Sequence, residues 1–495
     1  MTLRVTNTLT GEKEAFEPRD PDSVLFYYCG LTTSDPSHLG HARGWVHVDV
    51  MCRWLRWLGY DVRHVENFTD VNEKIVARVG EVGDSEADVA RHYVQSVIDD
   101  MRALNLDRAE VYPRVSEHVP QIVDLVETLV ENGYAYESNG SVYFDVTSFE
   151  DYGKLSNQQV DEIEAQGDPD EQSEKRNPAD FALWKDDGVD PAAIENHRHE
   201  GAAPAEEACE TAQTWNSPWG EGRPGWHIEC SAMSMTHLDE SIDVHAGGQD
   251  LVFPHHENEI AQSEAASGEQ FAKYWLHVRL LETKGEKMSS SLGNFFTTQA
   301  AVEEYGADVV RTFLLSTAYH NRAVYSEETI AEATERWETL ERGYERAVDA
   351  CDDVDAYATT RDESLRAAVA SARGEFERAM NDDFNTRKAL AALTELVGAV
   401  NVHVDGADTF DYQGLRETIE TLEEFGGDVL GLSFGDESAG GDVSVAEDLV
   451  ELVLDLRERE REAGNYERAD ELRDEVEALG VEVQDTDDGP TYRIE

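Results

Sequence analysis

Two histidines around a glycine are the residues of this chain best suited to bind an anion. His38 and His41 stand three residues apart, with Gly40 between them. Helical periodicity follows, so the imidazoles lie near a helix N-terminus, where unpaired N–H groups and the helix dipole favour negative charge. Gly40 lets a flat ligand approach the backbone. A nucleoside triphosphate would suit this loop. The alternative is that the histidines only cap a helix and Gly40 ends a turn.

The elements around this loop are predicted from hydrophobic patterns. The apolar run at 24–28 predicts a buried strand, and apolar residues recurring over 46–58 predict a helix. A second strand is expected at 62–65, which places Thr69 and Asp70 beside the first loop. Because ligands of open parallel sheets bind at the carboxyl ends of strands, the stretch 29–41 is expected to form a binding site.

A pair on one helical face could hold a metal ion. His255 and Glu259 are four residues apart in a segment expected to be helical, a spacing that turns both side chains the same way. Cys29 and Cys230, from two other core segments, would supply thiolates. Taken separately, such a His/Glu pair is usually a surface pair and a buried cysteine usually a small hydrophobe. Spacing alone therefore does not identify a metal site.

Composition limits the classes of protein. At 495 residues the chain is long enough for two to four domains. Its net charge is −64, spread over helices and loops alike, while 40% of its residues are hydrophobic, which argues against disorder. This favours adaptation to high salt, where self-repulsion is screened. The alternative is an acidic surface that binds a basic partner.

The cysteines and apolar runs predict a compartment. Five scattered cysteines without CxxC spacing indicate neither a disulfide framework nor a zinc ribbon. The segment 1–16 has no apolar signal region, and no apolar run approaches the length of a membrane span. We expect a soluble, cytoplasmic monomer without membrane association.

The order of the patterns predicts the domains. Residues 1–118 are expected to form the first half of a parallel-sheet core and 225–282 the second half. An insertion at 119–224 divides them; it includes a strand at 140–146 with the alternation of an edge strand and an acidic surface loop at 186–213. A region that contains a loop follows at 283–330, a helical bundle at 331–431, and a small module of two helices and two strands at 445–495.

Five motifs in order resemble one family. Pro36 to His41 resembles the H-x-G-H element of class I aminoacyl-tRNA synthetases, and Lys287-Met288-Ser289-Ser290-Ser291 resembles their K-M-S-K-S loop. Cys29 in its Cys-Gly-x-Thr context, the run from Trp226 to Met233 and the run from Phe253 to Ser263 are similar to the cysteinyl-tRNA synthetases in particular. The resemblance extends over nearly the whole chain and implies an α/β fold, a Rossmann-like core split by an insertion, then a helical bundle and a small C-terminal α+β module.

The resemblance implies a zinc site. In that family a Cys, Cys, His, Glu set binds one zinc ion, which corresponds here to Cys29, Cys230, His255 and Glu259. A pocket that uses shape alone separates a thiol from a hydroxyl or methyl by only about 10- to 200-fold. Zinc prefers soft sulfur and lowers the pKa of a bound thiol, so cysteine could be chosen over serine without editing. Four protein ligands are typical of closed sites, so zinc would have to expand to five ligands or bind Glu259 weakly.

The resemblance also assigns the catalytic roles. His38 and His41 would stabilise the pentavalent phosphate, and Lys287 the leaving pyrophosphate. ATP, with Mg²⁺, would contact His38, Gly40, His41, Lys287, Met288, Ser289, Ser290 and Ser291. The chain has only nine lysines, which makes Lys284 and Lys287 in one loop notable. The second lysine of the family's loop is Ser290 here, and we expect Lys287, with Lys284, to carry its role.

Other residues are expected to contact cysteine and tRNA. By resemblance, Thr69 and the backbone of Gly30 contact the amino acid; Trp226 would wall its pocket or serve as a core aromatic. Asp250 could accept hydrogen bonds from the substrate ammonium or a ribose. The bundle, with Asn381 to Thr386, is similar to the family's tRNA-contacting helical domain. The C-terminal module is similar to its anticodon-binding domain, where Tyr492 could stack on a base.

The expected reaction follows from these roles. Cysteine and ATP would give cysteinyl-adenylate and pyrophosphate, and the cysteinyl group would pass to the 3′ end of tRNA(Cys) with release of AMP. Two alternatives remain open: a ligase that joins activated cysteine to a small amine, and a non-catalytic regulator that binds cysteine or an adenylate. The segment 331–495 argues against the first. The presence of His38, His41 and Lys287 argues against the second.

Overall fold

The structure is a computed structural model that describes residues 2–163, 166, 171–199, 201–283, 286–287 and 296–435. Beyond 435 it describes 453–454, 457, 461, 468–469, 472–473, 481–486 and 489–494. The chain divides into two compact units, Met1–Phe434 and Gly435–Glu495. Each unit is described by itself.

A four-stranded parallel sheet lies at the centre of the first unit. Its strands are β3 (Ser23–Tyr28), β4 (Asp61–Glu66), β10 (Ile242–Gly248) and β11 (Ala272–Val278), in the order β11-β10-β3-β4. All three pairings are parallel. The chain moves from β3 to β4 on one side and returns after the insertion to β10 on the other, so a ligand crevice opens at the carboxyl end of β3. The predicted α/β fold with a split parallel core is confirmed.

Helix α1 (Leu39–Trp57) follows the loop after β3, as predicted. Fourteen of its nineteen residues are buried, so this helix is surrounded by the rest of the core. Arg43 is buried too, and its guanidinium donates hydrogen bonds to the carbonyls of Leu314 at 3.0 Å and Ala318 at 2.9 Å. These bonds satisfy the buried donors and attach α1 to helix α10 (Ala307–Leu315).

The insertion forms an antiparallel sheet of its own. Its strands are β5 (Ala135–Ser138), β6 (Ser141–Phe144), β7 (Phe181–Asp186), β8 (Trp215–Ser217) and β9 (Gly220–Pro224), in the order β5-β6-β7-β9-β8. The prediction of an edge strand at 140–146 is wrong, because β6 lies between β5 and β7 and all four of its residues are buried. Alternation of side chains indicated a strand but could not indicate its neighbours.

The acidic segment 186–213, which is expected to be a surface loop, has short helices and a few buried residues between its exposed stretches. It contains the short helices α5 (Pro191–Ile194) and α6 (Ala205–Cys209). Ile194, Ala205 and Ala208 are buried in a cluster with residues of helix α2 (Glu73–Val76). Helices of one turn are too short to show a helical period in the sequence. Their few apolar residues are also separated by many acidic ones, so no apolar pattern indicates them.

Two pairs of helices follow one another along the chain. Helix α2 is followed by α3 (Glu86–Ala103), which Ser85 caps. Helix α9 (Thr298–Tyr305) is separated from α10 by Gly306 at φ +83°. Helix α4 (Val119–Glu131) lies at the start of the insertion.

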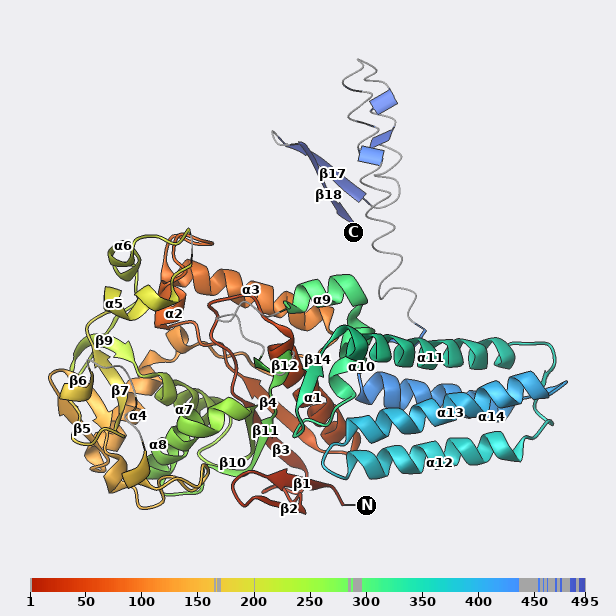
Figure 1. The fold of residues 1–495 in the computed structure, drawn as a ribbon, viewed down its shortest axis with the longest axis horizontal. Helices are drawn as coiled ribbons and strands as arrows, with labels where there is room; N and C mark the ends of the chain where they lie inside the picture. Colours follow the sequence, from red (N-terminus) through yellow and green to blue (C-terminus); the bar gives the residue numbers. More distant parts are fainter. Residues whose placement is uncertain are drawn as a thin grey trace. The chain divides into compact units, whose positions relative to one another are not determined.

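Four long helices pack side by side after residue 326 (Figure 1). They are α11 (Glu327–Cys351), α12 (Glu363–Met380), α13 (Thr386–Gly406) and α14 (Tyr412–Thr421), the last continued by a helical segment at Leu422–Val429. At Gly343 of α11, an added Cβ would lie 2.1 Å from Val397 of α13, so this glycine allows the two helices to approach closely. The predicted helical bundle is confirmed.

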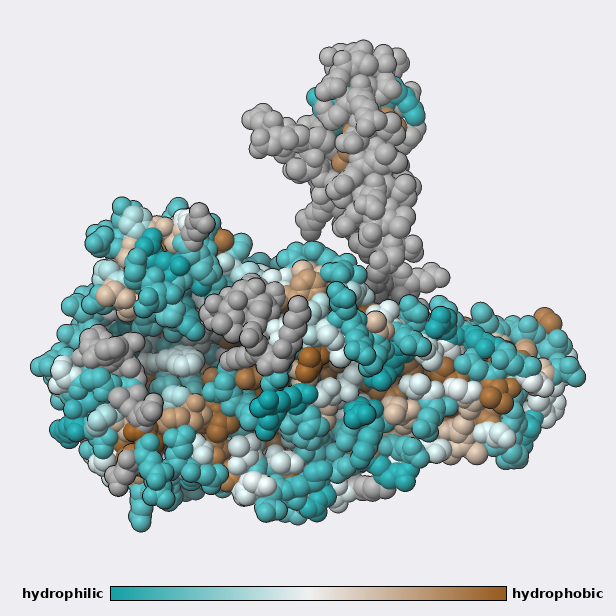
Figure 2. All heavy atoms as spheres, in the orientation of Figure 1, coloured by the Kyte–Doolittle hydropathy of each residue, from teal (hydrophilic) through white to brown (hydrophobic). Residues whose placement is uncertain are grey.

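The remaining elements of the first unit are short or flank the core. They are β1 (Arg4–Asn7), β2 (Glu12–Ala15), α7 (Trp226–His237), α8 (Glu257–Ser267), β12 (Leu281–Thr283), β13 (Glu286–Lys287), β14 (Ala323–Tyr325), β15 (Ala356–Tyr357) and β16 (Phe410–Asp411). Figure 2 shows that hydrophilic residues cover most of the visible face, as expected from a net charge of −64. Among the described residues, no helix is both long and apolar enough to cross a membrane.

The second unit contains one β-hairpin within its described residues. Strand β17 (Val481–Thr486) pairs antiparallel with β18 (Gly489–Ile494), which agrees with the two predicted strands. The two helices predicted for this module lie outside the described residues, apart from isolated positions.

Candidate active site

A cavity of about 330 Å³ lies at the carboxyl ends of the parallel strands. Its walls combine the loop after β3, the start of α1, the turn after β10 and the segment after β11. It brings together seven of the predicted site residues, namely Cys29, Gly30, His38, Gly40, His41, Trp226 and Asp250. Five separate stretches of sequence therefore meet at the crevice that the strand order creates.

His38 caps helix α1, as one interpretation of the motif expects. His38 Nδ1 accepts hydrogen bonds from the N–H groups of Gly40 at 3.1 Å and His41 at 3.4 Å, so it caps α1. The two rings stack with centroids 3.8 Å apart. Because Nδ1 of His38 accepts, the proton of its neutral ring sits on Nε2, which can donate to an anion. The helix cap thus orients the imidazole that would face a phosphate.

Asn67, directly after β4, holds the loop that carries Cys29. Its Oδ1 accepts hydrogen bonds from the Gly30 N–H and the Tyr27 hydroxyl, both at 2.9 Å. An added Cβ at Gly30 would lie 1.7 Å from the Asn67 carbonyl oxygen, so only glycine fits there. The Gly30 N–H therefore donates to Asn67, and Gly30 also lines the cavity. Sequence reasoning missed this role, although Asn67 ends a predicted strand.

Thr69 is buried beside the same loop rather than in the cavity wall. Its N–H donates to the Leu31 carbonyl at 3.1 Å, and its carbonyl accepts from the Thr33 N–H at 3.0 Å. Asn67 Nδ2 donates to its hydroxyl at 3.3 Å. Thr69 therefore supports the loop after β3 through these contacts.

Trp226 begins α7 and is 41% exposed, which is unusual for so large an aromatic side chain. Its ring centroid lies 4.6 Å from that of His255. An exposed ring at the edge of a cavity fits a substrate wall better than a core position. Asp250 lines the same cavity, on the turn after β10.

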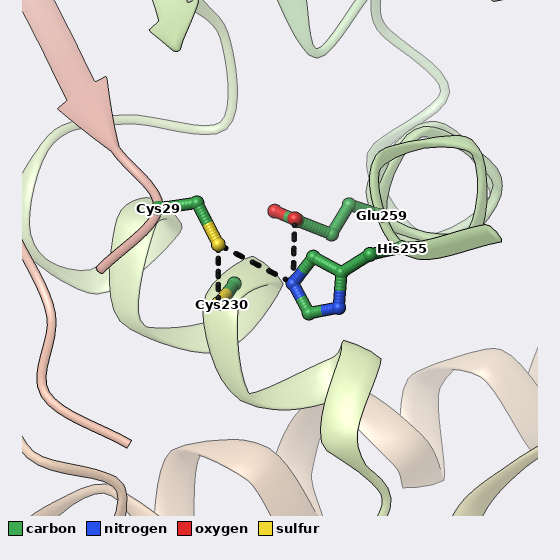
Figure 3. A group of neighbouring side chains, drawn as sticks. All are labelled: Cys29, Cys230, His255 and Glu259. Carbon is green, nitrogen blue, oxygen red and sulfur yellow. Dashed lines mark hydrogen bonds and ion pairs between the residues drawn. The ribbon is translucent and has the colours of Figure 1, made fainter. Parts of the chain in front are cut away.

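Four buried side chains form a donor cluster (Figure 3), and one of them, Cys29, also lines the cavity. Cys29 Sγ lies 3.6 Å from Cys230 Sγ and 3.4 Å from His255 Nε2. His255 Nε2 lies 3.1 Å from Glu259 Oε1, an oxygen that accepts no hydrogen bond from the described residues. All four donor atoms fall within 4.8 Å of one another. The four residues predicted as metal ligands are thus brought together from three core segments.

The spacing of these atoms fits a tetrahedral zinc ion. With Zn–S bonds of about 2.3 Å and Zn–N and Zn–O bonds of about 2.0–2.1 Å, the S–S edge is about 3.8 Å, the S–N edge about 3.6 Å and the N–O edge about 3.4 Å. The three observed separations, 3.6, 3.4 and 3.1 Å, are each slightly shorter. The donor set of thiolate, imidazole and carboxylate also suits zinc.

The four ligands do not share one protonation state. The hydrogen bond from Cys29 is the main reason that the pKa of Cys230 falls to about 6, although burial opposes it. Burial also opposes ionisation of Glu259, but His245 and His255 outweigh it and lower its pKa to about 2. The hydrogen bond with Cys230 raises the pKa of Cys29 well above its ordinary value, and, although burial lowers the pKa of His255, Cys230 and Glu259 raise it to about 10. Metal ligands must be deprotonated, so Cys29 and His255 must release protons when a cation binds.

Further histidines surround the cluster, and sequence reasoning did not single them out. Nδ1 atoms of His227 and His255 lie 2.9 Å apart, and His245 Nε2 lies 2.9 Å from Glu259 Oε2. His256 Nδ1 lies 2.8 Å from His277 Nε2. His245, His256 and Glu259 also have donor atoms within 4.8 Å of one another, so the clusters share Glu259. The contacts of His227 and His245 hold the side chains of His255 and Glu259 in their orientations.

The loop that resembles K-M-S-K-S is described only in part. Lys287 lies in β13, which pairs antiparallel with β12 so that Lys287 stands opposite Glu282. Met288, Ser289, Ser290 and Ser291 lie outside the described residues. Their expected contacts with ATP remain predictions.

Sequence families match three consecutive parts of the chain. The family described as "tRNA synthetases class I (C) catalytic domain" matches residues 15–335, so the parallel sheet and its histidine loop are those of a class I tRNA synthetase. A "DALR domain" matches 375–435 and a "Cysteinyl-tRNA ligase anticodon binding domain" matches 448–493.

Curated relatives define the family within this class. A cysteine-tRNA ligase of Haloarcula marismortui is 78% identical over 100% of both chains, and one of Halobacterium salinarum is 66% identical over 100% of both. That of Thermococcus onnurineus is 42% identical, covering 100% of this chain and 99% of its own. The chain belongs to the cysteine-tRNA ligase family. The first two organisms are halophilic, which supports the interpretation of the acidic charge as salt adaptation.

Solved structures share the fold at low identity. Methionyl-tRNA synthetase of Mycobacterium tuberculosis in complex with methionyl-adenylate aligns with a TM-score of 0.60 and 18% identity, over 85% of this chain and 92% of its own. A leucyl enzyme of Agrobacterium radiobacter, in a complex titled LeuRS-tRNA-LeuAMS, aligns with a TM-score of 0.54 and 13% identity, over 84% and 85%. These likenesses show a shared fold.

Proposed function

We propose that this enzyme ligates L-cysteine to the 3′ end of tRNA(Cys) through cysteinyl-adenylate. Full-length membership of the cysteine-tRNA ligase family carries the proposal. The sulfur- and nitrogen-rich cluster directly beneath the nucleotide-binding loop supports it, because that arrangement can select a thiol substrate. ATP, with Mg²⁺, and tRNA are the other partners.

The cluster of Cys29, Cys230, His255 and Glu259 would hold one zinc ion. When bound, zinc supplies a preference for soft sulfur and a lowered thiol pKa, so that cysteine is chosen over serine. Asn67 fixes the loop of Cys29, and His245 fixes the carboxylate of Glu259 through its 2.9 Å contact. The protein thus determines where the substrate sulfur can sit.

The residues around the cavity then orient the reacting groups. A carboxylate oxygen of cysteine attacks the α-phosphorus of ATP, and pyrophosphate leaves. His38 and His41 donate from their ring nitrogens to the phosphate, and Lys287 neutralises the departing pyrophosphate. Trp226 walls the amino-acid pocket and excludes water. Asp250 accepts hydrogen bonds from the substrate ammonium or the ribose.

Transfer completes the reaction. A hydroxyl of the 3′-terminal ribose of tRNA attacks the carbonyl carbon of the adenylate, and AMP leaves with the electrons of the broken C–O bond. No covalent enzyme intermediate is needed, since positioning and electrostatics supply the catalysis.

Cysteine charging of a tRNA transcript with a cysteine anticodon, in molar KCl, tests this function. We expect the tRNA to be charged with cysteine and not with serine. Cysteine-dependent pyrophosphate exchange without charging would indicate a ligase with a small acceptor instead. Absence of both activities would indicate a regulator that binds cysteine or an adenylate.

A further inference from the structure

A second cavity, of about 730 Å³, adjoins the cavity of the nucleotide loop. Its walls come from the insertion, including Phe181 and Lys185 of β7, and from the core. The two cavities share three lining residues, and these mark the place where the cavities meet: Thr32, Lys74 and Trp226. A ligand that extends from the larger cavity to an adenylate in the smaller one must pass these three residues.

We propose that Lys74 binds the phosphodiester on the 5′ side of the last nucleoside of tRNA, and so positions the acceptor hydroxyl for transfer. This inference rests on the proposed function and deepens it. The larger cavity would then hold the 3′-terminal nucleotides. Lys74 is a positioning residue for the second half-reaction only.

The charge of Lys74 is not neutralised within the described parts of the chain. Its ammonium makes no ion pair or hydrogen bond there, although the chain carries 105 acidic residues. In contrast, Lys13 pairs with Asp382 at 2.7 Å and Lys185 pairs with Glu73 at 3.3 Å. An exposed lysine that lacks a carboxylate partner in so acidic a protein leaves a local cation for an anionic ligand.

The backbone of Lys74 is held firmly at the boundary of core and insertion. The buried carboxylate of Glu86 accepts from the Asn72 N–H at 3.0 Å and from Arg223 of β9 at 2.6 Å. The ion pair of Lys185 and Glu73 joins β7 to the residue next to Lys74. These bonds connect α2 to both sides of the larger cavity, so the lysine stem starts from a fixed point.

The chemistry at the junction suits a single strand of nucleic acid. Phosphate groups supply most of the affinity in nucleic-acid binding, and lysine contacts them as a point charge. Exposed aromatic rings stack on unpaired bases of RNA. Trp226, 41% exposed, offers such a ring and lines the same two cavities as Lys74. The triphosphate of ATP is instead expected at His38 and His41, away from the larger cavity.

Separate assays of the two half-reactions on the full-length enzyme test this inference. For Lys74→Ala we expect unchanged cysteine-dependent pyrophosphate exchange and a loss of about 10-fold or more in kcat/KM for tRNA charging. The dependence of log kcat/KM on log salt should become shallower by about 0.7, as expected for one lost contact to a single-stranded phosphate. Lys74→Arg should restore most of the charging.

Lys13→Ala is the matched control, because it also removes one lysine but breaks only a surface ion pair. It should leave both assays unchanged. Lys74→Ala with unchanged charging and salt dependence would overturn the inference. A parallel fall in pyrophosphate exchange would overturn it too, because it would place Lys74 on ATP. If the wild-type enzyme charges tRNA in either case, the proposed function stands although the role of Lys74 does not.

Discussion

Replacing Asn67 by alanine tests how the substrate loop is held over the metal cluster. Asn67 is fully buried, and its Oδ1 accepts from the Gly30 N–H and the Tyr27 hydroxyl. Asn67→Ala leaves the buried Tyr27 hydroxyl without this partner, at about 1–3 kcal/mol, and also frees the half-buried Gly30 N–H, which lines the cavity. We therefore expect the free energy of unfolding to fall by about 1–3 kcal/mol. Because Gly30 follows Cys29, we also expect metal affinity to fall about 10- to 100-fold, as for other supporting residues of metal sites.

Two assays and two further variants make this prediction specific. Urea unfolding in molar KCl gives the stability, and metal content after dialysis against graded chelator gives the affinity. Asn67→Asp keeps an acceptor but places a carboxylate where the amide oxygen lies 3.8 Å from Cys230 Sγ, so it should lose metal through repulsion of the thiolate. Asn216→Ala, on exposed β8, should match wild type. Stability within about 0.5 kcal/mol of wild type and full metal content in Asn67→Ala would refute the reasoning.

Three further variants test other parts of the account. His255→Ala should bring the metal content close to zero, whereas exposed His92→Ala should keep it; equal metal content by elemental analysis would exclude His255 as a ligand. Lys287→Ala should slow cysteine-dependent pyrophosphate exchange strongly, and a wild-type rate would remove Lys287 from catalysis. Burial raises the pKa of Glu66 to about 8 from its ordinary 4.5, although a hydrogen bond from Trp45 lowers it. The folded chain therefore keeps this proton while the unfolded chain loses it, so the free energy of unfolding should fall between pH 5 and 8. Glu66→Gln should reduce that fall by up to about 3 kcal/mol, and an unchanged pH dependence in urea unfolding would contradict the assignment.

Long periodic segments were predictable from the sequence because one pattern determines each of them. The helix over 46–58 and the strands at 24–28 and 62–65 lie where their apolar spacing indicates. Short helices were not predictable, since α5 and α6 owe their position to a few apolar contacts with α2. The neighbours of β6 also depend on contacts between distant segments, which an alternating pattern does not contain.

The site residues also differ in this way: some are close together in the sequence, and others are brought together only by the fold. The histidines of the H-x-G-H loop are local, and their spacing alone indicated a helix start that could bind an anion. The metal ligands are separated by as many as 230 positions in sequence, and only the fold or a resemblance to a family can bring them together. Asn67, His227 and His245 carried no local signal, because each acts by contacting a ligand or loop from another segment.

Amino-acid-dependent pyrophosphate exchange measures whether the buried cluster selects cysteine. The exchange is followed with cysteine and with serine, in molar KCl, for the enzyme as purified, after chelation, and after zinc is added back. The account predicts exchange with cysteine only, its loss on chelation with the fold retained, and its return with zinc. Equal exchange with cysteine before and after complete removal of metal would contradict it.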